Sequence, residues 1–206
     1  MDLEQQSITP TRLLPDSYKR IWGLDLATDR TTALVLNLIS LPLFVVAGWL
    51  FLRAASLLNP GITAANFVRI LSVRPLVAYS GLVAVLVGTT LLHELIHGLF
   101  FWLTTRTKPV FGLKLLFAYA GAPEWYIPRN QYSVIGLAPF VMISLCGFLL
   151  IPLTPVVAGQ LILFGMVVNA AGAIGDLYVC GRVLRLPLDV LIRDTGYVFD
   201  VYGKAV

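Results

Sequence analysis

Long apolar blocks separated by short polar connections run along most of this chain. Four of the blocks have the length that a membrane-spanning helix needs, which is about 20 residues. The four blocks cover approximately residues 32–52, 76–103, 133–151 and 160–180. This pattern predicts a membrane all-α fold with four transmembrane helices.

The blocks divide the chain into three parts. Residues 1–31 are polar and mixed in charge, and they predict an N-terminal segment in the cytoplasm or at the membrane interface. Residues 32–181 would form the four-span membrane domain, and residues 182–206 a cytoplasmic C-terminal tail. The first 30 residues lack an apolar core, so no cleavable signal peptide is expected.

The composition agrees with a lipid bilayer as the main partner. Hydrophobic residues make up 58% of the 206 residues and charged residues 13%, against roughly 45–50% and about 25% in soluble domains. The net charge of +4 is modest, and no basic face interleaved with aromatic residues is present, which argues against a nucleic-acid partner. Both cysteines fall in apolar blocks, so a disulfide framework is not expected.

The lysines and arginines set the expected orientation in the membrane. The N-terminal segment, the loop over residues 104–132 and the tail together hold 12 of them, and the connection after the first span holds 3. The positive-inside rule then predicts an integral membrane protein with both termini in the cytoplasm.

The loop over residues 104–132 is the one connection with structure of its own. Aromatic and β-branched residues flank Gly121-Ala-Pro123, which is a turn signal. We therefore expect a small cytoplasmic β-hairpin between the second and third spans. It could present an edge strand to an extended substrate, or it could be a plain element of the membrane surface.

The second span carries His93-Glu94-Leu-Ile-His97, an H-E-x-x-H motif. On a helix the two histidines lie one turn apart on one face, so both rings can reach one metal ion. They are the only histidines in the chain, so any further protein ligand must be a carboxylate or a thiolate. Glu94 is placed to activate a water molecule without being a ligand itself.

Asp176 is the candidate third ligand. It and Glu94 are the only carboxylates within the apolar spans, where an ionisable group is costly unless it is paired or coordinated. In the expected topology Asp176 and the two histidines lie within about two helical turns of the same depth, near the cytoplasmic side. The alternatives for Asp176 are exposure at a helix end and pairing with Arg182.

Three small or polar residues near Asp176 extend this hypothesis. Gly172 and Gly175 would let two membrane helices approach closely. Asn169 lies two turns before Asp176 and could donate a hydrogen bond to a developing oxyanion or orient the substrate carbonyl. Its alternative role is a structural hydrogen bond between helices.

Together these residues predict a catalytic zinc site. His93, His97 and Asp176 would be three protein ligands with a fourth position left open, as in catalytic rather than structural zinc sites. Glu94 would act as general base and then pass the proton to the leaving amine. The predicted reaction is metal-assisted peptide hydrolysis.

The chain from about Leu76 onward resembles the zincin peptidase family of small prokaryotic membrane proteins, which is similar to the site-2 (intramembrane) metalloproteases. The resemblance is carried by the H-E-x-x-H motif, the loop after it, Gly136-Leu-Ala-Pro139, and the stretch from Asn169 to Asp176. It implies Zn²⁺ on His93, His97 and Asp176, Glu94 as catalytic base, and a membrane protein or peptide as substrate. The alternative function is a non-proteolytic four-span metal-binding or scaffold protein, although metal binding alone would not need Glu94.

Overall fold

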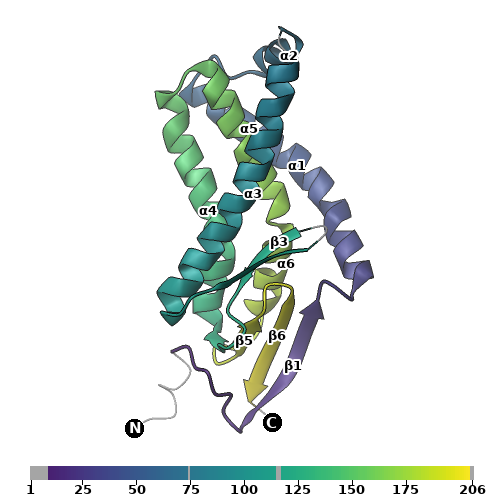
Figure 1. Ribbon diagram of the computed structural model, residues 1–206, viewed down its shortest axis with the longest axis vertical. Coiled ribbons are helices and arrows are strands. Elements are labelled where there is room, and N and C mark those ends of the chain that lie inside the picture. The colour runs from purple at the N-terminus through teal and green to yellow at the C-terminus, as the bar shows by residue number, and fades with distance from the viewer. Residues whose placement is uncertain (1–8, 74, 115–116, 205–206) are drawn as a thin grey trace. The chain divides into compact units, whose positions relative to one another are not determined.

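The computed structural model describes residues 9–73, 75–114 and 117–204 of the chain. This part is mostly helical and contains one four-stranded and one two-stranded antiparallel sheet (Figure 1). It forms two compact units. Unit 1 comprises the described residues within Met1–Leu36, Glu94–Ala138 and Gly175–Val206, and unit 2 comprises those within Asn37–His93 and Pro139–Ile174.

Among the described residues, three helices are long and apolar enough to cross a bilayer, and a bent pair of helices could form a fourth span. The three are α1 (Arg30–Leu58), α3 (Pro75–Thr105) and α4 (Arg129–Leu150), which continues into the short 3-10 helix η2 (Ile151–Leu153). The pair is α5 (Val156–Gly172) and α6 (Ile174–Val183), which are separated by a break at Ala173. The fourth span expected over residues 160–180 thus corresponds to two helices bent by 45° rather than to one straight helix, and the break lies shortly before Asp176.

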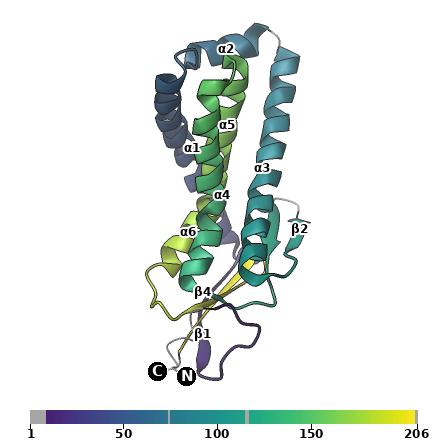
Figure 2. The same ribbon diagram turned by 90° about the vertical axis from the view of Figure 1, so that its left-hand side faces the viewer.

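The described residues of unit 2 form helices joined by short turns, and they contain no strand. The connection after the first span contains an additional helix, α2 (Ala64–Val73), which lies between α1 and α3 in Figure 2. The side chain of Asn59 accepts a hydrogen bond from the Gly61 N–H, as expected of an Asn-Pro-Gly turn. The Thr63 hydroxyl accepts one from the Asn66 N–H and so caps the start of α2.

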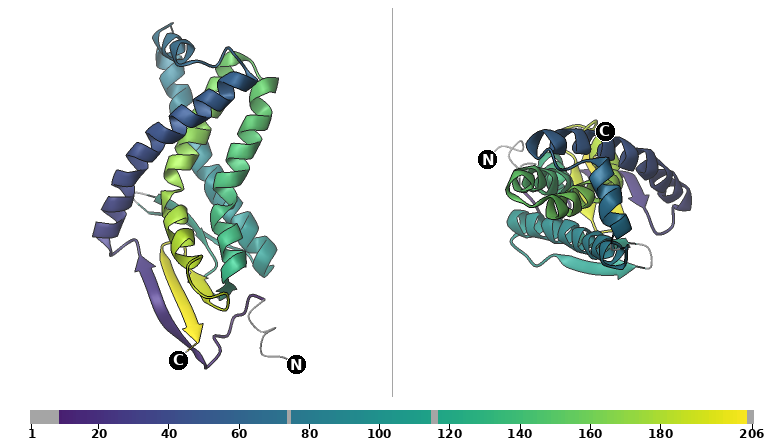
Figure 3. Two further views of the ribbon diagram at one scale, coloured as in Figure 1. Left: turned by 180° about the vertical axis from the view of Figure 1, so that it is seen from behind. Right: turned by 90° about the horizontal axis from the view of Figure 1, so that it is seen from above.

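Unit 1 contains a four-stranded sheet with the order β1-β6-β5-β4, and the paired strands are antiparallel. Figure 3 shows the purple β1 beside the yellow β6. The strands of this sheet are β1 (Tyr18–Asp25), β4 (Ile127–Pro128), β5 (Leu191–Asp194) and β6 (Val198–Lys204). The N-terminal segment thus supplies β1, and the tail supplies β5 and β6. The all-α prediction is wrong on this point, because the two segments expected to be separate pair with each other.

The two-stranded sheet consists of β2 (Val110–Lys114) and β3 (Phe117–Gly121). A turn does follow Gly121, since the Trp125 N–H donates to the Ala122 carbonyl oxygen. It does not connect the two strands of this sheet, however, because Gly121 is the last residue of β3 and pairs with Val110. A Cβ atom on Gly121 would lie 2.6 Å from the backbone nitrogen of Gly196. Glycine is therefore needed there for close packing against the β5–β6 turn.

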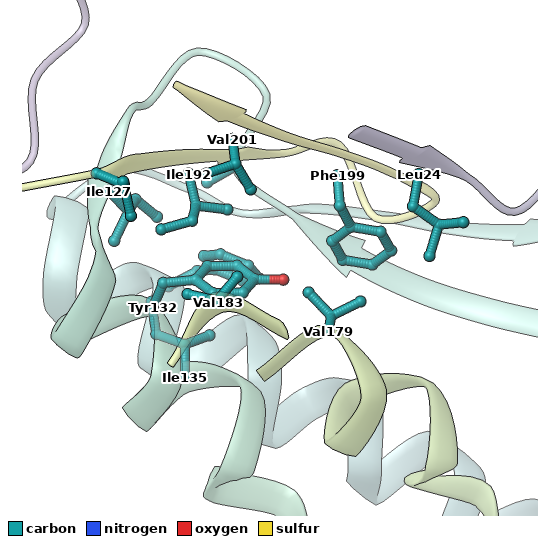
Figure 4. Packing of buried hydrophobic residues seen from close by; sticks show 12 residues of the cluster. Leu24, Ile127, Tyr132, Ile135, Val179, Val183, Ile192, Phe199 and Val201 are labelled. Atoms are coloured by element: carbon teal, nitrogen blue, oxygen red, sulfur yellow. The ribbon is translucent and has the colours of Figure 1, made fainter. Parts of the chain in front are cut away.

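The core of unit 1 lies between one face of the sheet and two helices (Figure 4). Leu24, Ile192 and Val201 come from the sheet, and each is at most 5% exposed. Ile135 of α4 and Val179 of α6 pack into the same cluster. This packing fixes α6, which carries Asp176 in its first turn.

Candidate metal centre

Both motif histidines lie on α3, which runs without interruption from unit 2 into unit 1. Helix geometry therefore places His93 one turn before His97 on the same face. The His97 ring is buried, with 7% exposure. Leu91 and Leu95 on the same helix are 56% and 58% exposed, so α3 turns its histidines away from its apolar outer face.

Asp176 meets His97 within unit 1. The Nε2 atom of His97 lies 3.4 Å from Oδ1 of Asp176. Two ligand atoms that bind one tetrahedral zinc ion, each at about 2.1 Å from the metal, are about 3.4 Å apart. The observed distance is therefore the one that a shared zinc ion requires. Asp176 also lies at the N-terminal end of α6, where the helix dipole favours a negative charge.

His93 completes a group of three possible metal ligands. One ligand atom from each of His93, His97 and Asp176 lies within 4.8 Å of the others. The structure thus brings together the three residues that the sequence predicts as ligands. The alternative partner for Asp176, Arg182, instead places its guanidinium carbon 5.6 Å from the centre of the Trp22 ring.

The orientation of the His97 ring follows from a proline in α4. Nδ1 of His97 lies 3.1 Å from the carbonyl oxygen of Ile135. This oxygen can only accept, so Nδ1 carries the proton and Nε2 is left as the ligand atom. In an unbroken helix the Ile135 carbonyl would accept from the N–H of residue 139, but residue 139 is a proline and has no N–H. Pro139 therefore leaves this carbonyl for His97.

The orientation of the His93 ring is set within unit 2 by Asn169. Nδ1 of His93 donates to the side-chain oxygen of Asn169 at 2.9 Å. The side-chain nitrogen of Asn169 in turn donates to the Pro139 carbonyl at 3.2 Å, which fixes the amide orientation. Asn169 is 2% exposed, and both ends of its amide are engaged. These contacts favour a role in positioning His93, while the predicted role at an oxyanion stays a prediction.

The chemistry of this donor set fits zinc. Two neutral imidazoles that present Nε2 and one carboxylate form a common catalytic zinc site. Carbonyl or amide oxygens that hold Nδ1 are the usual outer partners of zinc-bound histidines. Glu94 is half-buried beside His93, and it and Asp176 are among the carboxylates whose charge acts on His97.

A third acidic residue lies near His97, and its sequence context does not predict this position. Asp194, at the end of β5, is 5% exposed, and its charge also acts on His97. It accepts hydrogen bonds from the Tyr132 hydroxyl at 2.9 Å and from the Gly196 N–H at 2.6 Å. Burial raises the pKa of Asp194 to about 7, although both hydrogen bonds work in the opposite direction. The tail looks polar in sequence, and only the Asp194-Thr195-Gly196 turn signal marks this position.

The close helix contacts are made by other glycines than those predicted. Cβ atoms at Gly172 and Gly175 would meet nothing within 4 Å, so these residues do not bring helices together. A Cβ atom at Gly136 would lie 2.5 Å from Sγ of Cys180, and one at Gly165 would lie 2.9 Å from the Thr89 hydroxyl. Gly136 therefore sets the approach of α4 to α6 in unit 1.

His93, His97 and Asp176 could hold a metal ion, and Glu94 follows His93 on the same helix. This arrangement on apolar helices is typical of a metallopeptidase centre. A family model described as "Putative zincin peptidase" matches residues 86–191, which is just over half of the chain, so the chain belongs to this family. The matched segment includes His93, Glu94, His97, Asn169 and Asp176. No curated protein and no solved structure matches the chain.

Proposed function

We propose that this protein is a membrane-embedded zinc metalloendopeptidase that hydrolyses peptide bonds of membrane-associated substrates near the cytoplasmic face. The observation that carries the proposal is the 3.4 Å approach of His97 Nε2 to Asp176 Oδ1. His97 lies on α3, and the helical turn before it carries His93 and Glu94. Membership of the zincin peptidase family supports the same chemistry.

Each residue of the centre has one role in this proposal. His93, His97 and Asp176 would hold the zinc ion. Zinc bound there would supply a Lewis acid for the attacking water and the scissile carbonyl. Glu94 accepts a proton from the attacking water at its carboxylate and returns it to the departing amine, so that the residue ends the cycle in its starting state.

The surface around the motif supports a membrane-associated substrate. Leu91, Leu92, Leu95 and Leu99 surround the histidines in sequence, and each is at least 47% exposed. Lipid or an apolar segment of a substrate would cover such a face better than water. The excess of lysine and arginine in the terminal segments and the loop supports the cytoplasmic side as the location of the centre.

The exchange of Glu94 for glutamine tests the catalytic role. We expect Glu94→Gln to keep about one zinc ion per chain and to lower peptide cleavage by about 10²–10⁴-fold, because the general base is lost. Zinc is measured by elemental analysis of the purified protein. Cleavage is measured on a fluorescence-quenched peptide library presented in liposomes.

Glu124→Gln is the matched control. The Glu124 side chain is 71% exposed in the loop and lies 3.6 Å from Arg12, so its exchange should leave both zinc and cleavage unchanged. Equal cleavage by the two variants would contradict the proposed role of Glu94. One zinc ion per chain without cleavage of any library member by the unaltered protein would favour the alternative of a metal-binding protein.

A further inference from the structure

A small basic cleft lies in unit 1 between β1 and the end of α6. It has a volume of about 230 Å³ and is lined by Ile21, Trp22, Arg182, Arg185 and Leu186. Two of the five lining residues carry a positive charge and none carries a negative one. The cleft contains none of the residues of the metal centre.

One of the lining residues of the cleft, Trp22, follows an irregularity in β1. The register of β1 against β6 shifts between Arg20 and Trp22, so Ile21 is an extra residue in the strand. Trp22 then pairs with Val201 and packs against the core of unit 1. The guanidinium carbon of Arg182 lies over the Trp22 ring, 5.6 Å from its centre, which is within the range of a cation–π interaction. This contact would help to orient the guanidinium group.

The two arginines of the cleft have no competing use among the described residues. Arginines near a helix C-terminus often bind the last carbonyl oxygens. Here Arg129 takes that role, because it donates to the carbonyls of Leu184 and Leu186. Arg20 on β1 is also occupied, since it pairs with Asp200. Within the described part of the chain, the Arg182 and Arg185 side chains have neither a hydrogen bond nor an ion pair.

Exposed apolar side chains in the cleft and next to its residues in sequence indicate what approaches it. Ile21, Leu184 and Leu188 are 50%, 47% and 66% exposed. The cleft also lies at the end of the α5–α6 pair, which is apolar enough to be a broken span. Basic residues at the end of a span, next to exposed leucines and a tryptophan, match the chemistry of a bilayer surface.

We propose that this cleft binds the phosphate of an anionic phospholipid headgroup. The planar guanidinium groups of Arg182 and Arg185 would donate paired hydrogen bonds to the phosphate oxygens. Trp22 would cover the glycerol end of the headgroup, and the exposed leucines would contact its acyl chains. This inference does not depend on the metal centre or on peptidase activity.

Native mass spectrometry of the full chain in neutral detergent tests the proposal. The probe is an equimolar mixture of dioleoylphosphatidylglycerol and dioleoylphosphatidylcholine. We expect the unaltered chain to prefer phosphatidylglycerol, and Arg182→Gln/Arg185→Gln to reduce that preference about tenfold, because each lost contact is a hydrogen bond between charged groups. Arg182→Lys/Arg185→Lys should lie between the two, because it keeps the charges but not the planar fork.

Lys19→Gln/Lys108→Gln is the matched control, since it removes two exposed charges from unit 1 outside the cleft. It should keep the preference of the unaltered chain. Equal preferences for the two glutamine variants, with equal melting temperatures, would overturn the proposal. Complete displacement of phosphatidylglycerol by excess inorganic phosphate would also overturn it, because the cleft would then be a site for free phosphate.

Discussion

The two units of the molecule bury their apolar residues in different ways. In unit 1 the twelve residues of the core cluster are each at most 8% exposed, as in a water-soluble domain. In α1 and α3, most of which belong to unit 2, only 11% and 6% of the most apolar 18-residue stretch is buried inside the protein. Lipid is the expected solvent for those helices. Hydrophobic packing within the protein therefore covers the core of unit 1. In unit 2 such packing is confined to a smaller buried cluster that includes Ile62 and Met166, and the exposed apolar faces of α1 and α3 are suited to lipid.

The two histidines differ in the group that orients each ring. His97 belongs to unit 1, and a backbone carbonyl of α4 orients its ring. His93 belongs to unit 2, and the side-chain amide of Asn169 orients its ring. A backbone acceptor survives most substitutions, whereas a side-chain acceptor can be removed by one. The two halves of the centre should therefore respond differently to mutation.

The largest effect is expected from a matched pair of leucines. Leu24 is 5% exposed in the core of unit 1, and Leu38 of α1 is 56% exposed. Leu24→Ala should lower the free energy of unfolding by about 2–5 kcal/mol, because it leaves a cavity, and Leu38→Ala by less than about 0.5 kcal/mol. Thermal unfolding in mild detergent measures both. Similar losses for the two variants would remove the distinction between the units.

The second effect depends on pH and concerns Asp194 in unit 1. Its pKa is about 7 in the folded chain, because burial disfavours the carboxylate, and 3.8 is its ordinary value. Between about pH 4 and 7 the unfolded chain loses this proton while the folded chain keeps it, so stability falls as the pH rises through this window. Asp194→Asn keeps the shape and the hydrogen bond from Gly196, and it should remove this decline.

The measurement compares the melting temperatures of the two proteins between pH 4 and pH 8, with a chelator present. The variant should be the more stable protein at pH 8, by a few kcal/mol at most, and the difference should shrink toward pH 4. Asp189→Asn is the control, because it removes another carboxylate of the tail, one that pairs with Lys204. Parallel pH curves for Asp194→Asn and the unaltered chain would contradict the assigned role of burial.

The third effect tests the support of His93 in unit 2. Asn169→Ala removes the acceptor of the Nδ1 proton and should weaken zinc binding about 10–100-fold. Asn169→Asp restores an acceptor and should recover much of this loss. Asn66→Ala, which removes an amide of α2 that bonds to Gly61, should have no effect. Competition with a chromophoric chelator gives the affinities. Unchanged zinc affinity with lost cleavage would instead support the predicted role of Asn169 at an oxyanion.

Much of the metal centre could be predicted, because it depends either on local helix geometry or on the free-energy cost of a charged group in an apolar span. His93 and His97 are separated by one helical turn, so their relation depends only on helix geometry. Asp176 was identifiable because an unpaired carboxylate in an apolar block is expensive. The family match over residues 86–191 confirms the resemblance to zincin peptidases. The break at Ala173 carried no comparable signal, since no proline marks it.

The four-stranded sheet could not be predicted because its pairing is not local. Tyr18 pairs with Lys204 at the opposite end of the chain, and no local pattern encodes such a partner. Buried and half-buried residues alternate along Val198–Lys204 in the structure, but the sequence of this segment does not indicate which strand lies beside it. Asp194 was missed for the same reason, since the sheet and Tyr132 together bury it.

The smallest effect is expected at Pro139, and it isolates the support of His97. Pro139→Ala adds an N–H group that would bond to the Ile135 carbonyl, as in an ordinary helix. That carbonyl has two lone pairs, so the His97 hydrogen bond should be weakened rather than lost. Zinc affinity should therefore fall by less than about tenfold, while α4 itself becomes slightly more stable. Pro42→Ala is the matched control, because Pro42 also lies inside a membrane-length helix, α1, but has no part in the metal centre. Equal zinc affinities for the two proline variants would show that the missing N–H at residue 139 is not what frees the acceptor for His97.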